Sequence, residues 1–143
     1  MSKVIIYSDG ASKGNPGDAG IGVVISSQDG TLLKEISHYI GKVTNNMAEY
    51  VALIVGLREA LRLGATSVEI STDSELMARQ LAGVYKVKAE NLKPLFAEAI
   101  ELLRQFSQVS ISHVMREFNK RADELANEGV RKHRDVLRNN HVG

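Results

Sequence analysis

The 143-residue sequence contains no cysteine, no tryptophan and only two prolines. The absence of cysteine excludes a disulfide scaffold, a thiolate metal site and a cysteine nucleophile. It fits a reducing compartment, so we expect a cytoplasmic protein. No apolar run approaches the roughly 18 residues that a membrane span needs, and the first residues do not have the layout of a signal peptide. We therefore expect no membrane partner.

A large excess of charge of one sign is also lacking, because 18 Lys and Arg face 17 Asp and Glu. Taken alone, a net charge of +1 argues against a generally basic, polyanion-binding surface. Hydrophobic residues make up 43% and charged residues 24%, as in ordinary globular proteins. The length fits one domain of roughly 100–200 residues. We expect a single monomeric domain over residues 1–143, with a basic C-terminal extension from about residue 131.

Turn residues and changes of hydrophobic period divide the chain into strands and helices. Short apolar or alternating runs predict strands over residues 4–7, 21–26, 31–40, 68–72 and 109–113. Helical spacing predicts helices over residues 45–63, 74–82 and 91–106, and a last helix that Asn119 can cap. The first three strands form an antiparallel meander, whereas strands joined through helices are parallel. The predicted fold is therefore α/β, a five-stranded mixed sheet of three antiparallel and then two parallel strands, flanked by helices.

Four acidic residues lie at the ends of these predicted elements. Asp9 follows the first strand and Asp73 the fourth, and neighbouring strands about 4.8 Å apart would bring both to one sheet edge. Glu49 and Asp123 lie near helix starts, where the helix dipole favours acids. Carboxylates gathered this closely repel one another unless a cation neutralises them, and Mg²⁺ prefers oxygen ligands. The sequence predicts a Mg²⁺ or Mn²⁺ site, and two ions about 3.5–4 Å apart would suit phosphodiester hydrolysis.

Each acid also has an ordinary structural interpretation. Asp9 precedes a glycine and has the sequence of a turn, and Asp73 before Ser74 has that of a helix N-cap. Glu49 and Asp123 could be solvated charges on helix surfaces. The functional interpretation depends on all four converging at one edge, which periodicity indicates but does not measure.

The four acids stand in four motifs that follow one another along the chain. These are DGASKGNPG at residues 9–17 with GIG at 20–22, TNNMAE at 44–49, STDS at 71–74 and NKRADELA at 119–126. In composition, order and spacing they resemble the motifs of type 1 ribonuclease H. The third motif is weak alone, but the first two are specific. The resemblance extends over nearly the whole chain, from residue 3 to about residue 130.

The resemblance implies the ribonuclease H-like fold and endonucleolytic hydrolysis of the RNA strand in RNA–DNA hybrids, leaving 5′-phosphate and 3′-hydroxyl ends. It implies that Asp9, Glu49, Asp73 and Asp123 are the catalytic residues and hold two Mg²⁺ or Mn²⁺ ions when substrate is bound. Further positions correspond to the family's substrate contacts. The backbone of Gly10, Ala11 and Ser12 corresponds to contacts with RNA sugars, Asn15, Asn45 and Asn46 to groove contacts, and Lys42 and Thr44 to a pocket for a DNA phosphate.

One departure from the family pattern concerns the loop after the fifth strand. Many relatives carry an auxiliary histidine in a longer loop, whereas here residues 115–118 make a short connection. His113 alternates with apolar residues, so we expect a strand side chain there. Arg116 is better placed to reach the scissile phosphate as a cation, with a solvated surface arginine as the alternative.

A second departure concerns basic segments. Some relatives insert a basic helix where residues 83–93 are short and hold only Lys86, Lys88 and Lys93. We therefore expect weaker hybrid binding, with a shallower salt dependence, than in those relatives. The C-terminal extension is basic as well, and is either a solvated helix end or a nucleic-acid contact. Its basic residues are Arg131, Lys132, His133, Arg134 and Arg138.

Two other functions are compatible with such a fold. One is a catalytically silent module that binds hybrids or double-stranded RNA, and the other is a DNA-directed nuclease of the resolvase or integrase kind. The presence of all four acids favours an enzyme over the silent module. The glycine-containing stretch at residues 10–12 favours RNA over DNA, because a backbone that approaches the sugar closely can sense the 2′-hydroxyl. An RNA–DNA hybrid is therefore the expected partner, with double-stranded RNA as the alternative.

Overall fold

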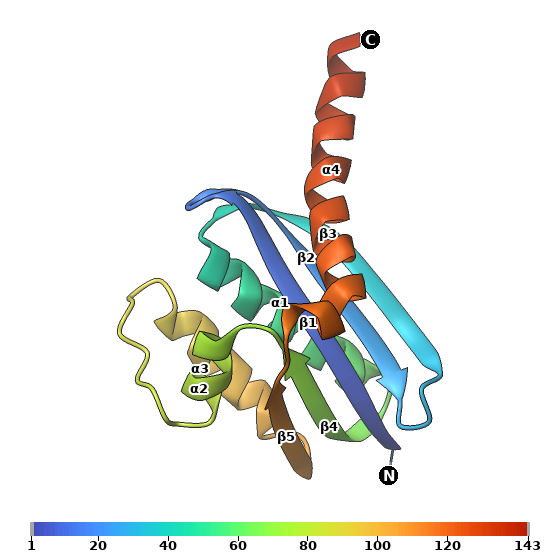
Figure 1. The fold of residues 1–143 in the computed structure, drawn as a ribbon, viewed down its shortest axis with the longest axis vertical. Coiled ribbons are helices and arrows are strands. Elements are labelled where there is room, and N and C mark those ends of the chain that lie inside the picture. Colours follow the sequence, from blue (N-terminus) through green and yellow to red (C-terminus); the bar gives the residue numbers. More distant parts are fainter. Residues whose placement is uncertain (1, 143) are drawn as a thin grey trace.

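The structure, a computed structural model, describes residues 2–142 and the side chains of residues 2–133. Its centre is a five-stranded sheet with the order β3-β2-β1-β4-β5 (Figure 1). β1 (Ser2–Gly14), β2 (Gly17–Ser27) and β3 (Leu32–Val43) are antiparallel neighbours. β4 (Ala65–Thr72) runs parallel to β1, and β5 (Gln108–His113) parallel to β4. The five-stranded mixed sheet is therefore confirmed.

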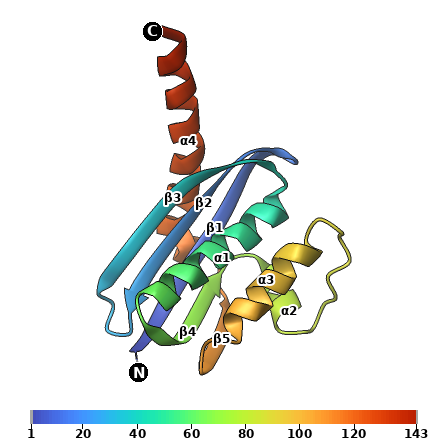
Figure 2. The ribbon, with the colours of Figure 1, turned by 180° about the vertical axis from the view of Figure 1, so that it is seen from behind.

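Helices cover both faces of the sheet. α1 (Asn45–Arg62), α2 (Glu75–Leu81) and α3 (Lys93–Leu103) lie on one face (Figure 2). A 3₁₀ turn, η1 (Arg116–Asn119), leads into α4 (Lys120–Val142), which crosses the opposite face over β1, β2 and β3 and continues past the sheet (Figure 1). None of the helices in residues 2–142 is both long and apolar enough to cross a membrane.

The core lies between the sheet and α1, α2 and α3. Alternate residues of the strands point toward α1, which turns apolar residues toward them at helical spacing. The fully buried members include Ile6, Ile21, Ile25, Leu53, Leu57 and Ile70. Each contributes about 1.5–3 kcal/mol to folding through its burial. This core holds α1 against β1 and so fixes where the first turns of α1 meet the sheet.

On the other face, the backbone of α4 approaches β2 closely at two glycines. A Cβ added to Gly22 would lie 2.0 Å from the carbonyl oxygen of Ala122, and one added to Gly20 would lie 2.2 Å from that of Ala126. Only glycine permits so close an approach. The GIG motif at residues 20–22 therefore seats the first turns of α4, which carry Asp123.

The glycine-rich first motif differs from the prediction. The first strand does not end at residue 7 with a turn at Asp9, because β1 continues to Gly14 and pairs with β2 from Val4–Ser27 to Gly14–Gly17. Beyond Ser8, β1 separates from β4 and runs on as one arm of a long hairpin. Gly10, Gly20 and Gly22 pack closely against helices, whereas Gly14 and Gly17 flank the hairpin turn at Asn15 and Pro16.

Two smaller predictions were also wrong. Asn119 does not cap the last helix, because its buried amide donates to the carbonyl oxygen of Ser8 over 2.9 Å and its Oδ1 has no partner. α3 is shorter than residues 91–106, although Pro94 does lie in its first turn.

Candidate active site

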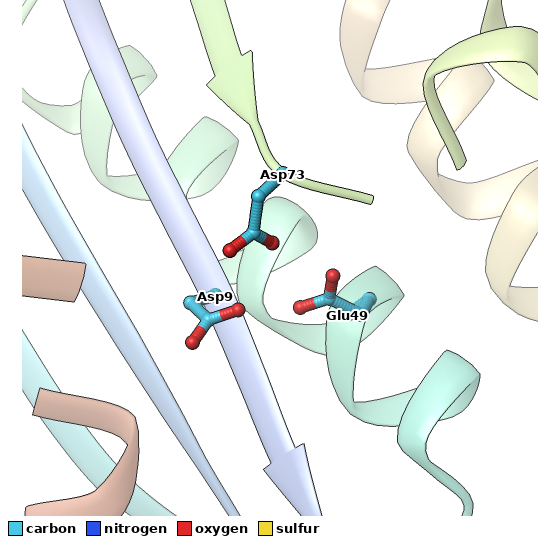
Figure 3. A group of neighbouring side chains, drawn as sticks. All are labelled: Asp9, Glu49 and Asp73. Carbon is cyan, nitrogen blue, oxygen red and sulfur yellow. The ribbon is translucent and has the colours of Figure 1, made fainter. Parts of the chain in front are cut away.

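Three of the four predicted acids meet at the point where β1 and β4 separate. Ser8 and Thr72 form the last parallel pair of these strands, and Asp9 and Asp73 are the next residue of each. Glu49 reaches them from the beginning of α1 (Figure 3). One carboxylate oxygen from each of the three acids lies within 4.8 Å of the others. The predicted convergence at one edge of the sheet is therefore present for Asp9, Glu49 and Asp73.

Gly10 is the reason that Glu49 can come so close to β1. A Cβ on Gly10 would lie 2.3 Å from the carbonyl carbon of Ala48 and 2.5 Å from the nitrogen of Glu49. The backbone of α1 therefore rests directly on the strand, and the Gly10 N–H donates to Oε1 of Glu49. The Thr44 hydroxyl caps α1 by accepting from the N–H of Met47 over 3.2 Å. These contacts set both the position and the orientation of the Glu49 carboxylate.

The group is buried, and its carboxylates are mutually destabilised as anions. Asp9 is 4% and Glu49 5% exposed. Burial raises the pKa of Asp9 well above its usual range, and repulsion from Glu49 and Asp73 adds to the effect. Burial likewise raises the pKa of Glu49, although the hydrogen bond from the Gly10 N–H opposes this. Without a cation, the group therefore holds protons to a higher pH than ordinary carboxylates do.

Asp73 has one oxygen that no protein group satisfies. Its Oδ2 is buried without a hydrogen-bond partner. The nearest cation is Arg116, whose Nε lies 3.9 Å away on a side chain that is 81% exposed. Arg116 is thus beside the acidic group, but it is too distant and too solvated to neutralise the group.

Asp123 stands slightly apart from the other three acids. It is half-buried in the first turn of α4 and lines the same cavity, and it is not a member of the group within 4.8 Å. It is close enough to Asp9 that a proton shared with its carboxylate helps to raise the pKa of Asp9. The fourth predicted acid therefore borders the group from the opposite face of the sheet.

The acids line an open cavity of about 650 Å³. Of the predicted substrate contacts, Gly10, Ala11, Ser12 and Asn45 also line it. The remaining four, Asn15, Lys42, Thr44 and Asn46, do not. Two of these four shape the start of α1: Asn15 accepts from the N–H of Asn45 over 3.1 Å, and Thr44 is the helix cap. Lys42 and Asn46 are exposed beside this start.

Several residues that line the cavity were not predicted as site residues, among them Lys13, Ser74, His113, Met115 and Asn127. His113 is a strand residue, as expected, but it is exposed rather than packed in the core. Its register partner is Thr72, which directly precedes Asp73. Asn127 lies one helical turn after Asp123, so helical spacing alone could have indicated it.

Comparisons with known proteins identify sequence relatives of this chain. Residues 7–129 match the family described as "Reverse transcriptase-like". The bifunctional protein Rv2228c of Mycobacterium tuberculosis is 44% identical over 129 residues, 90% of this chain and 35% of the relative. Ribonuclease HI of Halobacterium salinarum is 44% identical over 128 residues, 90% of this chain and 64% of the relative. The chain therefore spans about a third of the first relative's length and just under two thirds of the second's.

Two solved structures of ribonucleases H1 have the same architecture as this chain. The crystal structure of RNase H1 from Halobacterium salinarum superposes with a TM-score of 0.89 at 44% identity, covering 91% of this chain and 98% of that chain. LC11-RNase H1, solved in complex with an RNA/DNA hybrid, superposes with a TM-score of 0.86 at 47% identity, covering 90% and 97%. The fold expected from the four motifs is confirmed by these similarities.

Proposed function

The chain belongs to the type 1 ribonuclease H family, and from this premise we propose that it is a metal-dependent endonuclease that hydrolyses the RNA strand of RNA–DNA hybrids. The observation that carries the proposal is the meeting of Asp9, Glu49 and Asp73 within 4.8 Å at an open, polar cavity. The RNA/DNA hybrid bound by LC11-RNase H1 supports hybrids as the substrate class. Each chain in that comparison is covered almost fully, which favours a shared substrate-binding surface.

The donor set suits hard divalent cations. All its ligand atoms are carboxylate oxygens, the Asp73 Oδ2 is buried without a partner, and repulsion within the group calls for positive charge. Asp9, Glu49 and Asp73 would hold the first ion, and Asp123 would help to hold a second. Two bound Mg²⁺ or Mn²⁺ ions would supply an activated water and stabilise the leaving oxygen. The metal's identity and the number of ions are part of the proposal.

The chain's own residues would hold the substrate in line for hydrolysis. Water would add to phosphorus and the bond from phosphorus to the 3′-oxygen would break, leaving a 5′-phosphate and a 3′-hydroxyl. The Gly10 N–H keeps Glu49 directed toward the group, so this carboxylate does not need to reorient during the reaction. The exposed Arg116 guanidinium lies beside Asp73 and would contact the non-bridging oxygens of the scissile phosphate.

Selection of RNA would rest on backbone contacts. Gly10, Ala11 and Ser12 line the cavity next to the acids, and a backbone without bulky side chains can approach the 2′-hydroxyl of a ribose closely. Asn45, which is exposed and lines the cavity, would add a polar contact to the substrate. Asn15, Lys42, Thr44 and Asn46 would meet the hybrid outside the cavity, along the start of α1. These substrate roles are proposals that single substitutions can test.

Hybrid binding is expected to be weak compared with relatives that carry a basic helix in the corresponding place. From the end of α2 to the first residue of α3, the only basic residues are Lys86, Lys88 and Lys93. Fewer neutralised phosphates give a shallower slope of log affinity against log salt. Arg131 and Lys132 of the C-terminal extension are exposed, whereas the side chains of Arg134 and Arg138 lie outside the described residues. A monomeric single domain over residues 1–143 and a cytoplasmic location also remain proposals.

Cleavage of labelled substrates tests the proposed function. The protein is incubated with an RNA–DNA hybrid, double-stranded RNA and double-stranded DNA, each with Mg²⁺, with Mn²⁺ and with EDTA. We expect cleavage of the hybrid's RNA strand only, dependent on metal, with 5′-phosphate ends, and loss of at least about 10³-fold in Asp73→Asn. Intact hybrid across the whole metal titration would refute the enzyme and favour the silent binding module. Preferential cleavage of DNA would favour a resolvase-like nuclease.

A further inference from the structure

Asp123 is held by a residue that the proposed function does not use. Asn127 lies one turn further along α4, and its Nδ2 donates to the backbone oxygen of Asp123 over 2.9 Å and to the carboxylate Oδ1 over 3.3 Å. The Oδ1 of the same amide accepts a hydrogen bond of 2.6 Å from Nζ of Lys13. Asn127 and Asp123 are half-buried, and all three residues line the cavity. Asn127 thus joins the hairpin arm of β1 to the acid of α4.

Charge determines which way round the Asn127 amide lies. Its carbonyl oxygen faces the ammonium of Lys13, and its NH₂ group faces the carboxylate of Asp123. After a 180° flip, the NH₂ group would face an ammonium and the oxygen a carboxylate, and both contacts would become repulsive. Lys13 therefore selects the amide orientation in which Asn127 can donate to Asp123.

The two elements bring these side chains together in two adjacent rows. Asp9 and Lys13 are four residues apart on β1, and strand alternation places them on the same face. Asp123 and Asn127 are four residues apart on α4, and helical spacing places them on one side of the helix. Asp9 lies near Asp123, and Lys13 binds Asn127. The contact between Lys13 and Asn127 therefore lies beside the contact between Asp9 and Asp123 and helps to hold Asp123 next to the other three acids.

We propose that Asn127 is a positioning residue that orients the Asp123 carboxylate toward the ion-binding group, and that Lys13 acts through Asn127 by fixing its amide. The inference rests on the proposed function only in that Asp123 is taken to help to bind metal. Residues that orient metal ligands commonly alter metal affinity by 10–100-fold when they are removed. Because Asp123 is one acid of four, we expect an effect near the lower end of that range.

The first experiment measures the hydrogen bonds of the Asn127 side-chain amide, without metal or substrate. The side-chain NH₂ protons of Asn127 are followed by ¹⁵N–¹H NMR in the wild-type protein, in Lys13→Met and in Asp123→Ala. We expect two well-separated resonances in the wild type. Their separation should decrease in Asp123→Ala, which removes the carboxylate acceptor, and in Lys13→Met, which frees the amide to flip. Unchanged resonances in both variants would overturn the proposal.

The second experiment measures metal binding by electron paramagnetic resonance of Mn²⁺ titrated into protein without hybrid. We expect Asn127→Ala to weaken Mn²⁺ binding by about tenfold and Lys13→Met by about threefold. The double variant should bind Mn²⁺ no more weakly than Asn127→Ala alone, because Lys13 acts only through Asn127. Glu128→Gln is the matched control: it is the next residue of α4, and it faces Arg121 at 3.8 Å instead of the cavity. Its Mn²⁺ affinity should equal that of the wild type.

Steady-state cleavage of the hybrid separates positioning from substrate contact. In Asn127→Ala the Mg²⁺ concentration for half-maximal rate should rise, whereas the KM for hybrid at saturating Mg²⁺ should change less than twofold. A raised KM with unchanged Mn²⁺ affinity would overturn the proposal and make Asn127 a substrate contact. Additive losses in the double variant would overturn the role given to Lys13. Should the wild type not cleave hybrids while the Mn²⁺ results hold, the proposed function fails and the positioning role stands.

Discussion

Replacing Asp9 by asparagine should stabilise the metal-free protein while it abolishes cleavage. At 4.8 Å, the upper limit of the separation between the three acids, two ionised carboxylates repel by about 3 kcal/mol at an effective dielectric constant near 20. The group avoids part of this repulsion by keeping a proton, which is why the pKa of Asp9 is raised. Since asparagine is neutral but must still be buried, we expect a net gain of about 2 kcal/mol at pH 8, or about 6 °C in Tm.

The gain should depend on pH with a definite sign. The pKa of Asp9 is higher in the folded state than its unfolded value near 4, so the folded protein holds this proton more tightly. The resulting contribution to stability is complete below about pH 4 and is lost as the pH rises toward the folded-state pKa. The metal-free wild type should therefore lose stability between pH 5 and pH 8 relative to Asp9→Asn. The difference between their Tm values should be small at pH 5 and largest at pH 8.

Asp29→Asn is the matched control, with the same chemical change in an exposed hairpin. Hydrogen bonds from the Ser27 hydroxyl and the Thr31 N–H lower the pKa of Asp29 to about 2, so its charge stabilises the fold throughout this pH range. This variant should be slightly less stable than the wild type, by the same amount at pH 5 and pH 8. Differential scanning fluorimetry in EDTA measures all three proteins. If Asp9→Asn is destabilised at pH 8, or if its gain does not grow with pH, the repulsion argument is wrong.

Three further outcomes are expected. Mg²⁺ should raise the Tm of the wild type more at pH 8 than at pH 5.5, because protons on Asp9 and Glu49 compete with the ion, as thermal scans at fixed Mg²⁺ would measure. Gly22→Ala should cost about 3 kcal/mol in urea unfolding, since its methyl would lie 2.0 Å from the Ala122 oxygen, whereas Gly30→Ala meets no atom within 4 Å and should cost only about 1 kcal/mol through its positive φ. Arg116→Ala should lower kcat/KM on hybrids about tenfold with an unchanged Tm, because its exposed side chain contributes little to folding; an unchanged rate would make it an ordinary surface arginine.

The features that depend on local spacing were predicted well. α1 begins at Asn45, as predicted, and ends at Arg62, one residue short of the predicted end. The signals that determine these ends are local: Thr44 caps the helix, its apolar residues recur at helical spacing, and Gly64 follows it. The meeting of Asp9 and Asp73 was predicted from strand order, since both follow the last pair of neighbouring parallel strands. Topology rules thus suffice where each residue's partner is determined by the order of the elements.

The features that depend on distant partners were not predicted. The glycines of the first motif indicate a turn when considered alone, yet Gly10 is required because Ala48 rests on it. Asn119 has the sequence of a helix cap, but its amide bonds to Ser8, which is 111 residues away. Asn127 binds Lys13 across 114 residues. One residue type serves turns, caps and long-range contacts equally well, so only the assembled fold distinguishes between them.

The order of the acids along the chain has a consequence for synthesis. Asp9, Glu49 and Asp73 lie on β1, α1 and the end of β4, which emerge from the ribosome well before α4 does. Asp123 reaches its place only when α4 docks with its backbone against Gly20 and Gly22. Asp123 follows Asp73 by 50 positions, and at about 5–20 residues per second this stretch takes several seconds to make. A nascent chain therefore lacks its fourth acid throughout this interval, and the docking of its last helix completes the set.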